Sequence, residues 1–366
     1  MNVFITSDTH FRHNNIIKYC NRPFKNVDEM NNSLIKNWNS VVSNEDVVFH
    51  LGDFGFGSKD QLSPIIKSLN GTIVMLHGNH KSLSTAQWNS FGVKVCNDPI
   101  KLSNDIYLSH RPMNLLNDDM WNIHGHIHQE VLKGNYINVS VEQTNYSPIL
   151  LYNLIIENIL GISIEDFSYM YGFLISDGYW RDNNKTLEME IKDKDLPIKF
   201  QKLLPQTTIR ERCRNTNFKK NNTTYIWKGK RNGIFEYLCS SMGFPIEDKS
   251  KNASIPKNFQ FSERDFWRGV FDANGSIGTR KDGSEYMSLT IVSEQEKIEF
   301  CQLLEKVIGF KSKAKRNKRD NIYNIGVNTN SARKLGDYLY KNATLYLDRK
   351  YNKYKEWRDK YERKTS

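Results

Sequence analysis

The chain has 366 residues, and its positive charge is unevenly distributed. Residues 1–150 carry 12 basic and 13 acidic side chains, whereas residues 151–366 carry 40 and 28, and all nine histidines lie between His10 and His128. This length is too great for one ordinary core, so we expect two or three domains. The lack of a signal-like N-terminus and of any run of about 18 apolar residues argues against an exported or membrane-spanning protein. We therefore expect a cytoplasmic location, in the host cell if the gene belongs to a phage.

Residues 1–150 alternate short apolar runs with helical patterns. The apolar runs 2–7, 46–52, 72–78 and 105–109 predict strands, and the segments 28–42 and 59–69 predict helices. Polar residues stand at or just beyond the strand ends, which predicts that candidate ligands collect along one edge of a sheet. They are Asp8 and His10, Asp53, Asn79 and His80, His110, and His126 with His128.

The spacing and chemistry of these residues favour a metal site. Asp8 and His10, like His126 and His128, are separated by two positions, which in extended backbone points both side chains the same way. Neighbouring glycines permit tight turns and close approach of the backbone. Imidazole, carboxylate and amide donors together favour Mn, Fe or Zn over Ca. The other four histidines, His13, His50, His77 and His124, are expected to be ordinary polar residues.

In this order, the motifs D-x-H, G-D, G-N-H, a lone His and G-H-x-H resemble the calcineurin-like metallophosphoesterase family, over about residues 1–149. The resemblance implies an α/β fold in which helices flank a β-sandwich, with two divalent metals. It assigns one metal to Asp8, His10, Asp53 and His128, and the other to Asp53, Asn79, His110 and His126. A metal pair can clamp a phosphate and activate a water, so the expected activity is phosphoester hydrolysis.

His80 resembles the family histidine that approaches the phosphate and the leaving oxygen as an acid. The family usually has an acidic residue after this histidine, whereas Lys81 stands here. The resemblance therefore implies weaker protonation of the leaving group by His80. The sequence does not specify the phosphoester substrate.

After a connector at residues 150–165, the chain repeats itself. The segment 170–178 matches 267–275, with small residues at Gly172 and Gly269 that would let two helices approach closely, and with Gly178 and Gly275 ending each helix. A predicted hairpin, an amphipathic helix and a basic strand follow in both halves. Alternate positions of the basic strands share one face, and two such faces favour double-stranded DNA as partner. The basic residues are Arg210, Arg212 and Arg214 in the first half, and Lys311, Lys313 and Lys315 in the second.

These features resemble a monomeric two-motif LAGLIDADG homing endonuclease, with one repeat at 166–260 and another at 261–366. The resemblance implies an α+β fold, a duplicated pseudo-twofold αββαββα arrangement with two four-stranded sheets, and Mg held by a carboxylate at the foot of each motif helix. Asp177 matches that carboxylate in the first repeat, but Asn274 occupies the position in the second. Asp272 lies about 200° away around a helix and is a poor substitute. We predict binding to a long DNA site with impaired cleavage or nicking of one strand.

Three functions remain open from the sequence. In the first interpretation, the chain is a phosphoesterase fused to a homing endonuclease. An intron reading frame that continues in frame from a phosphoesterase exon would encode this fusion. Alternatively, the basic half is a non-cleaving DNA- or RNA-binding module, similar to a maturase or a remnant. In the third interpretation, the basic half delivers DNA to the metal site of the first domain.

Overall fold

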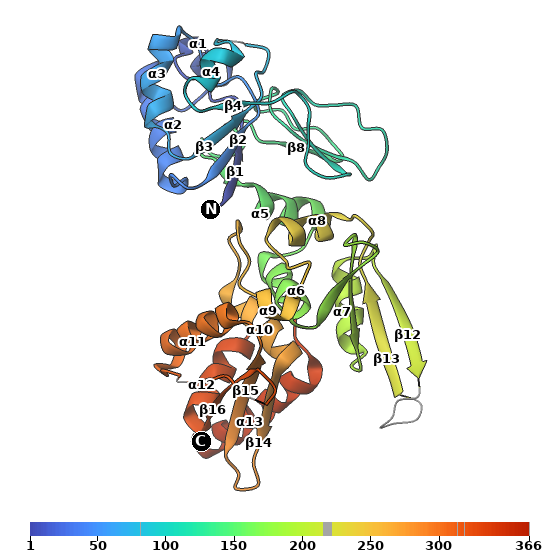
Figure 1. Cartoon of the computed structure of the whole chain (residues 1–366). Helices are drawn as coiled ribbons and strands as arrows, with labels where there is room; N and C mark the ends of the chain where they lie inside the picture. Colours follow the sequence, from blue (N-terminus) through green and yellow to red (C-terminus); the bar gives the residue numbers. More distant parts are fainter. Residues whose placement is uncertain (81, 215–221, 313, 318, 366) are drawn as a thin grey trace. The chain divides into compact units, whose positions relative to one another are not determined.

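The computed structural model describes residues 1–80, 82–214, 222–312, 314–317 and 319–365, with the backbone alone for residues 362–365 (Figure 1). The chain divides into two compact units. Unit 1 comprises Met1–Ile159 with the short segment Lys257–Gln260, and unit 2 comprises Leu160–Pro256 and Phe261–Ser366. No helix among the described residues is long and apolar enough to cross a membrane.

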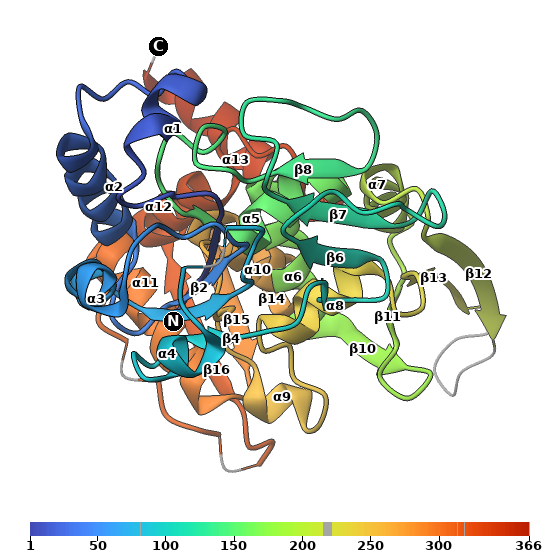
Figure 2. The same cartoon turned by 90° about the horizontal axis from the view of Figure 1, so that it is seen from above.

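Unit 1 contains two β-sheets. The first has the order β4-β3-β2-β1-β9, and its strands β1 (Val3–Thr6), β2 (Val47–His50), β3 (Thr72–Met75) and β4 (Lys94–Val95) are parallel, while β9 (Ile149–Leu150) is antiparallel to β1. The second has the order β5-β6-β7-β8, formed by Ile100–Lys101, Ile106–Ser109, Trp121–His124 and Tyr136–Asn138. Its strands β6, β7 and β8 are parallel and lie side by side in Figure 2. The two-sheet α/β fold expected from the sequence is confirmed.

Helices α2 (Val27–Val41) and α3 (Lys59–Ser68) lie side by side next to the first sheet (Figure 1). Helix α2 begins where the Asn26 side chain accepts a hydrogen bond from the Glu29 amide. Its buried residues Met30, Leu34 and Trp38 recur every four positions, so one stripe of the helix enters the core. The remaining helical segments of unit 1 are short: α1 (Asn14–Tyr19), α4 (Thr85–Asn89), α5 (Leu151–Ile155) and the π-helix η1 (Ile156–Leu160), which ends at the first residue of unit 2.

The first half of unit 2 has the expected order of elements. Helix α6 (Ile164–Asp177) leads into β10 (Gly178–Arg181) and β11 (Thr186–Ile191), followed by α7 (Asp195–Leu203). The long strands β12 (Thr208–Arg214) and β13 (Asn222–Lys228) run beside each other (Figure 1) and precede α8 (Ile234–Ser241) and α9 (Lys249–Asn252). The four strands form one antiparallel sheet in the order β10-β11-β13-β12.

The second half repeats this plan with one strand fewer. It contains α10 (Glu263–Asn274), β14 (Gly275–Thr279), β15 (Glu285–Ile291), α11 (Glu294–Ile308), β16 (Tyr323–Asn328), α12 (Thr329–Tyr340) and α13 (Asp348–Thr365). The prediction of a second four-stranded sheet is wrong for the part of the chain described, where β14-β15-β16 form three strands and the described residues between α11 and β16 form none. Polar composition is not the reason, since β12 is equally polar; a strand also needs a neighbouring strand to pair with.

Helices α6 and α10 pack against each other at two glycines. A Cβ atom added at Gly172 would lie 2.2 Å from the carbonyl oxygen of Phe266, and one at Gly269 would lie 2.2 Å from that of Tyr169. Each separation is well inside van der Waals contact, so only glycine allows these backbones to meet. The predicted close approach of the two motif helices is confirmed. The helices end at Gly178 and Gly275, as the sequence predicts.

Candidate metal centre and candidate nucleic-acid interface

In unit 1, the sequence-predicted ligands follow the carboxyl ends of five parallel strands. Asp8 and His10 follow β1, Asp53 follows β2, and Asn79 and His80 follow β3. In the second sheet, His110 follows β6, and His126 and His128 follow β7. Parallel strands place their carboxyl ends at one edge, so loops from both sheets bring these side chains together.

The backbone at this edge differs from the extended conformation predicted for the pairs Asp8–His10 and His126–His128. These four residues and Asp53 have φ angles between 49° and 73°, in the left-handed region. Asp and His visit this region more readily than most residues, yet it remains sterically crowded for any side chain. The extended backbone predicted for the two pairs is therefore wrong, and the side chains of each pair converge through turns.

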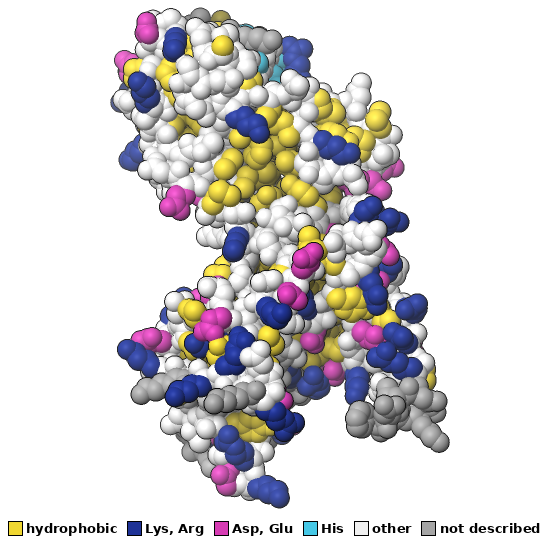
Figure 3. Space-filling view, in the orientation of Figure 1, with side chains coloured by type: hydrophobic (Ala, Val, Ile, Leu, Met, Phe, Trp, Pro, Cys, Tyr) yellow, Lys and Arg dark blue, Asp and Glu magenta, His cyan; other side chains and the backbone are white. Residues whose placement is uncertain are grey.

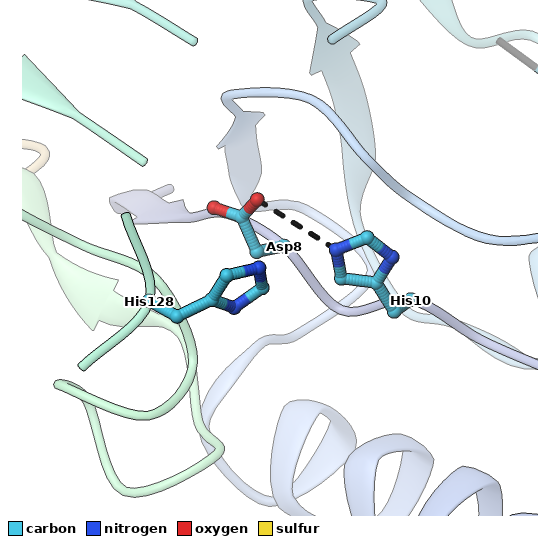
Figure 4. A group of neighbouring side chains, drawn as sticks. All are labelled: Asp8, His10 and His128. Carbon is cyan, nitrogen blue, oxygen red and sulfur yellow. Dashed lines mark ion pairs between the residues drawn. The ribbon is translucent and has the colours of Figure 1, made fainter. Parts of the chain in front are cut away.

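The first ligand group consists of Asp8, His10 and His128 (Figure 4). His10 Nε2 lies 3.9 Å from Asp8 Oδ1, too far for a hydrogen bond, and both atoms are buried without a hydrogen-bond partner among the described residues. Two donors bound to one ion at about 2.1 Å lie at most about 4.2 Å apart. Orphaned polar atoms at this spacing fit a divalent metal between them.

Asp8 is held in place by its other oxygen. Oδ2 accepts hydrogen bonds from the His126 amide at 2.8 Å and from Ser140 Oγ at 3.0 Å. A Cβ atom added at Gly125 would lie 2.2 Å from this oxygen, so the glycine of G-H-x-H is needed for the carboxylate to occupy its position.

The second ligand group consists of Asp53, His110 and His126. Asp53 Oδ2 lies 3.4 Å from His110 Nε2 and 3.8 Å from His10 Nε2, so one oxygen stands between the two groups. His110 Nδ1 contacts the Leu51 carbonyl oxygen at 2.9 Å, and its Nε2 lies 2.7 Å from Asn79 Oδ1. An Nδ1–H bonded to a carbonyl leaves Nε2 as the metal-binding nitrogen.

The local electrostatics favour the ligand forms of His10 and Asp53. Burial, together with the Arg22 guanidinium, lowers the pKa of His10 to about 2, so its ring stays neutral. Burial alone would raise the pKa of Asp53, but the hydrogen bond with His110 holds it below its ordinary value. Carboxylates raise the pKa of His110, and that of His128 to about 10, so a metal that binds these two rings displaces a proton from each.

His80 lies exposed at the rim of this edge. Its amide donates to Asp53 Oδ1 at 2.8 Å, and its ring centroid lies 5.8 Å from that of His10. Lys81 lies outside the described residues. Of the four histidines expected to be ordinary, His50 contacts Thr9 Oγ1 and His77 contacts Thr85 Oγ1, each at 2.9 Å, and His124 Nδ1 lies 2.9 Å from the Gly125 carbonyl oxygen. The fourth, His13, packs its ring 5.4 Å from His10.

In unit 2, Asp177 and Asn274 are exposed at the ends of α6 and α10. Asp272 is buried and accepts hydrogen bonds from Tyr169 Oη at 2.7 Å, Tyr340 Oη at 2.6 Å and the Leu347 amide at 2.8 Å. These three bonds hold Asp272 inside the protein core. Its carboxylate therefore does not replace the acid missing at Asn274.

Two lysines that the sequence analysis missed occupy matching positions at the ends of these helices. Lys249 Nζ donates to the carbonyls of Leu174, Ser176 and Gly178. Lys350 Nζ donates to those of Phe271, Asp272 and Gly275. The last carbonyls of a helix have no intrahelical partner, so each ammonium satisfies a helix end. They follow Gly178 and Gly275 by 71 and 75 residues, so a comparison of the repeats by position alone does not align them.

The basic residues of the two halves differ in structure. Arg210, Arg212 and Arg214 are exposed at alternate positions of β12, but Arg212 and Arg214 lie 3.3 and 3.4 Å from Glu190. Lys311 and Lys315 are exposed outside any strand, so the strand predicted there is wrong, and Lys313 lies outside the described residues. Figure 3 shows Lys and Arg side chains of unit 2 interspersed with Asp and Glu.

A family model described as calcineurin-like phosphoesterase matches residues 1–200, more than half of the chain. The chain belongs to the calcineurin-like phosphoesterase family. The resemblance inferred from the five motifs is confirmed, and the protein is a hydrolase of phosphoester bonds. A second model, described as a LAGLIDADG-like domain, matches residues 262–340, so the phosphoesterase is fused to such a domain.

Individual proteins are similar to parts of this phosphoesterase. An uncharacterized protein of Methanocaldococcus jannaschii is 40% identical over 163 residues, covering 41% of this chain and 86% of its own. A protein of unknown function from Aquifex aeolicus is 26% identical, covers 40% of this chain and 94% of its own, and has a TM-score of 0.33. The homing endonuclease I-WcaI bound to its DNA recognition sequence is 15% identical, covers 52% and 86%, and has a TM-score of 0.41.

Proposed function

We propose that unit 1 of this phosphoesterase contains a centre for two divalent metal ions. One divalent metal is held by Asp8, His10, Asp53 and His128, and the other by Asp53, Asn79, His110 and His126. The single observation that carries this proposal is the convergence of two ligand groups on Asp53 Oδ2, beside the orphaned atoms Asp8 Oδ1 and His10 Nε2. The mixed nitrogen and oxygen donors favour Mn, Fe or Zn.

When bound, the metal pair supplies positive charge for the phosphoryl oxygens and makes a water nucleophilic near neutral pH. The chain's own residues position and protonate the substrate. His80, exposed at the rim, donates a proton to the leaving oxygen. Asp53 stays ionised between the two groups, and His10 stays neutral because it is buried.

A direct test is hydrolysis of bis(p-nitrophenyl) phosphate by the full chain with Mn. Wild-type protein should hydrolyse this diester only when metal is present, and Asp53→Asn should reduce both hydrolysis and the number of metals bound. Full activity in the Asp53→Asn variant would contradict the proposed bridging role.

For unit 2, we propose binding of double-stranded DNA through the exposed arginines of β12, by a monomer that cuts poorly or nicks one strand. Asp177 is an exposed carboxylate at the end of α6, and it would hold Mg. A non-cleaving nucleic-acid-binding module is the second candidate, and two observations favour it: Asn274 lacks the acid, and Asp272 is sequestered by three hydrogen bonds. An origin as an intron frame that continues from a phosphoesterase exon would account for the fusion.

The two candidates are separated with Asp53→Asn protein, Mg, and a supercoiled plasmid carrying the uninterrupted phosphoesterase gene. Site-specific nicked or linear DNA supports the nuclease, and Asn274→Asp should then increase linear product. Intact plasmid that shifts in a gel supports the binding module. DNA cutting that disappears only in the Asp53→Asn variant would instead assign the cutting to unit 1.

A further inference from the structure

A buried carboxylate outside the predicted ligand set contacts the metal centre of unit 1. Glu142 Oε1 accepts hydrogen bonds from His128 Nδ1 at 3.0 Å and from the Arg22 guanidinium, with Nη2 at 2.7 Å and Nε at 2.9 Å. The side chains of Glu142 and Arg22 are 2% and 0% exposed. Two charges this deeply buried are costly to desolvate, so a pair of this kind needs compensating hydrogen bonds and points to a role beyond packing.

Arg22 extends the contact to the other side of the first ligand group. Its Nη2 donates to the Asp8 carbonyl oxygen at 2.8 Å, and its Nη1 donates to that of Thr9 at 2.9 Å. Thr9 lies between Asp8 and His10, both of which have left-handed backbone. One guanidinium therefore binds the backbone turn that presents two ligands and the carboxylate that contacts the third.

The geometry points to Glu142 and Arg22 as the positioning pair of the first metal site, a role that rests on the proposed metal centre. Glu142 accepts the Nδ1–H of His128, which fixes that tautomer and leaves Nε2 with its lone pair toward Asp8 and His10. Arg22 forms an ion pair with Glu142 and donates hydrogen bonds to the backbone turn at Asp8–Thr9. Neither residue touches the substrate or the reacting atoms.

Glu142→Gln is the sharpest perturbation because it keeps the size of the side chain and removes its charge. We expect the affinity for one of the two Mn ions to fall 10- to 100-fold, which is the usual effect of losing a residue that hydrogen-bonds a metal ligand. The other ion should bind as before. Glu130→Gln is the matched control: it is an exposed glutamate between His128 and Glu142 in the chain, and it should leave both affinities unchanged.

Calorimetric titration of the metal-free full-length proteins with Mn gives the first readout. The positioning role is supported if the wild type binds two Mn ions and Glu142→Gln binds one at the same Mn concentration. Two ions at wild-type affinity in Glu142→Gln overturn it and leave the proposed metal centre standing. Absence of Mn binding in the wild type would overturn both.

The tautomer of His128 is a second readout. A change in packing alone would not alter it, whereas loss of the hydrogen bond to Glu142 would. In protein labelled with ¹⁵N at histidine, the wild type with Zn should show His128 protonated at Nδ1, and Glu142→Gln should lose that preference. If Glu142→Gln does not fold, the wild-type spectrum decides: protonation at Nε2 alone would overturn the proposal.

Discussion

Replacing Gly125 by Ala should disable the metal centre by displacing the Asp8 carboxylate together with the neighbouring Ser7 side chain. The added Cβ would lie 2.1 Å from Ser7 Oγ and 2.2 Å from Asp8 Oδ2, whereas ordinary Cβ contacts begin at about 3.4 Å, so Ser7 and Asp8 must each move by about 1 Å. Functional groups must be held within about 0.5 Å, and a 1 Å misplacement can cost about 100-fold. We expect kcat/KM for bis(p-nitrophenyl) phosphate to fall about 100-fold, equivalent to about 2.7 kcal/mol of transition-state stabilisation.

Gly134→Ala is the control for this experiment. Gly134 has a φ of 88° and no atom within 4 Å of an added Cβ, so its substitution strains the backbone without touching Asp8. Its cost should be limited to about 1–2 kcal/mol of stability. Equal losses of activity in the two variants, or full metal occupancy and activity in Gly125→Ala, would refute the reasoning.

Three further predictions concern unit 2. Gly269→Ala should lower the free energy of unfolding of unit 2 by about 2 kcal/mol in urea, because overpacking against the Tyr169 carbonyl exceeds the gain in helix propensity. Gly326→Ala is the control and should not destabilise unit 2, since its Cβ would meet nothing closer than 3.7 Å. Burial would raise the pKa of Glu285, but hydrogen bonds from Tyr361 and Arg333 lower it to about 2. The stabilisation is therefore complete above the ordinary value of 4.5 and is lost as pH falls toward 2. Hydrogen exchange of α13 should be faster in Glu285→Gln than in wild type at pH 7, and a difference that persists undiminished at pH 2 would contradict this. Glu190→Gln should strengthen DNA binding up to about fivefold, because it frees Arg212 and Arg214 from their ion pairs. Fluorescence anisotropy at a fixed salt concentration measures this, and an unchanged affinity would exclude β12 from the DNA interface.

Much of the metal centre could be predicted because its residues follow strand ends in a recognisable order. Asp8, Asp53 and His110 each come after a short apolar run, and parallel strands bring such positions together. The left-handed backbone at these residues could not be predicted, because it depends on tertiary contacts such as the hydrogen bond from the His126 amide to Asp8. Arg22 and Glu142 lie in irregular segments 120 residues apart, and no spacing rule connects them.

In unit 2, the internal repeat predicted the helix pair but overstated the symmetry. Gly172 and Gly269 are at corresponding positions because both helices must approach equally closely. The basic positions after α11 alternate as those of β12 do, yet the described residues there form no strand. Alternation shows which side chains would share a face of a strand, but the strand itself requires a neighbour to pair with.

The left-handed backbone at five ligand residues sets a conflict between activity and stability. Each such residue stores about 1–3 kcal/mol of strain that glycine would not incur. Glycine at Asp8 or His128 would thus relax the backbone of the metal-free fold while it abolished a ligand. The positions that supply metal ligands are therefore positions where the fold gives up backbone stability for a side chain.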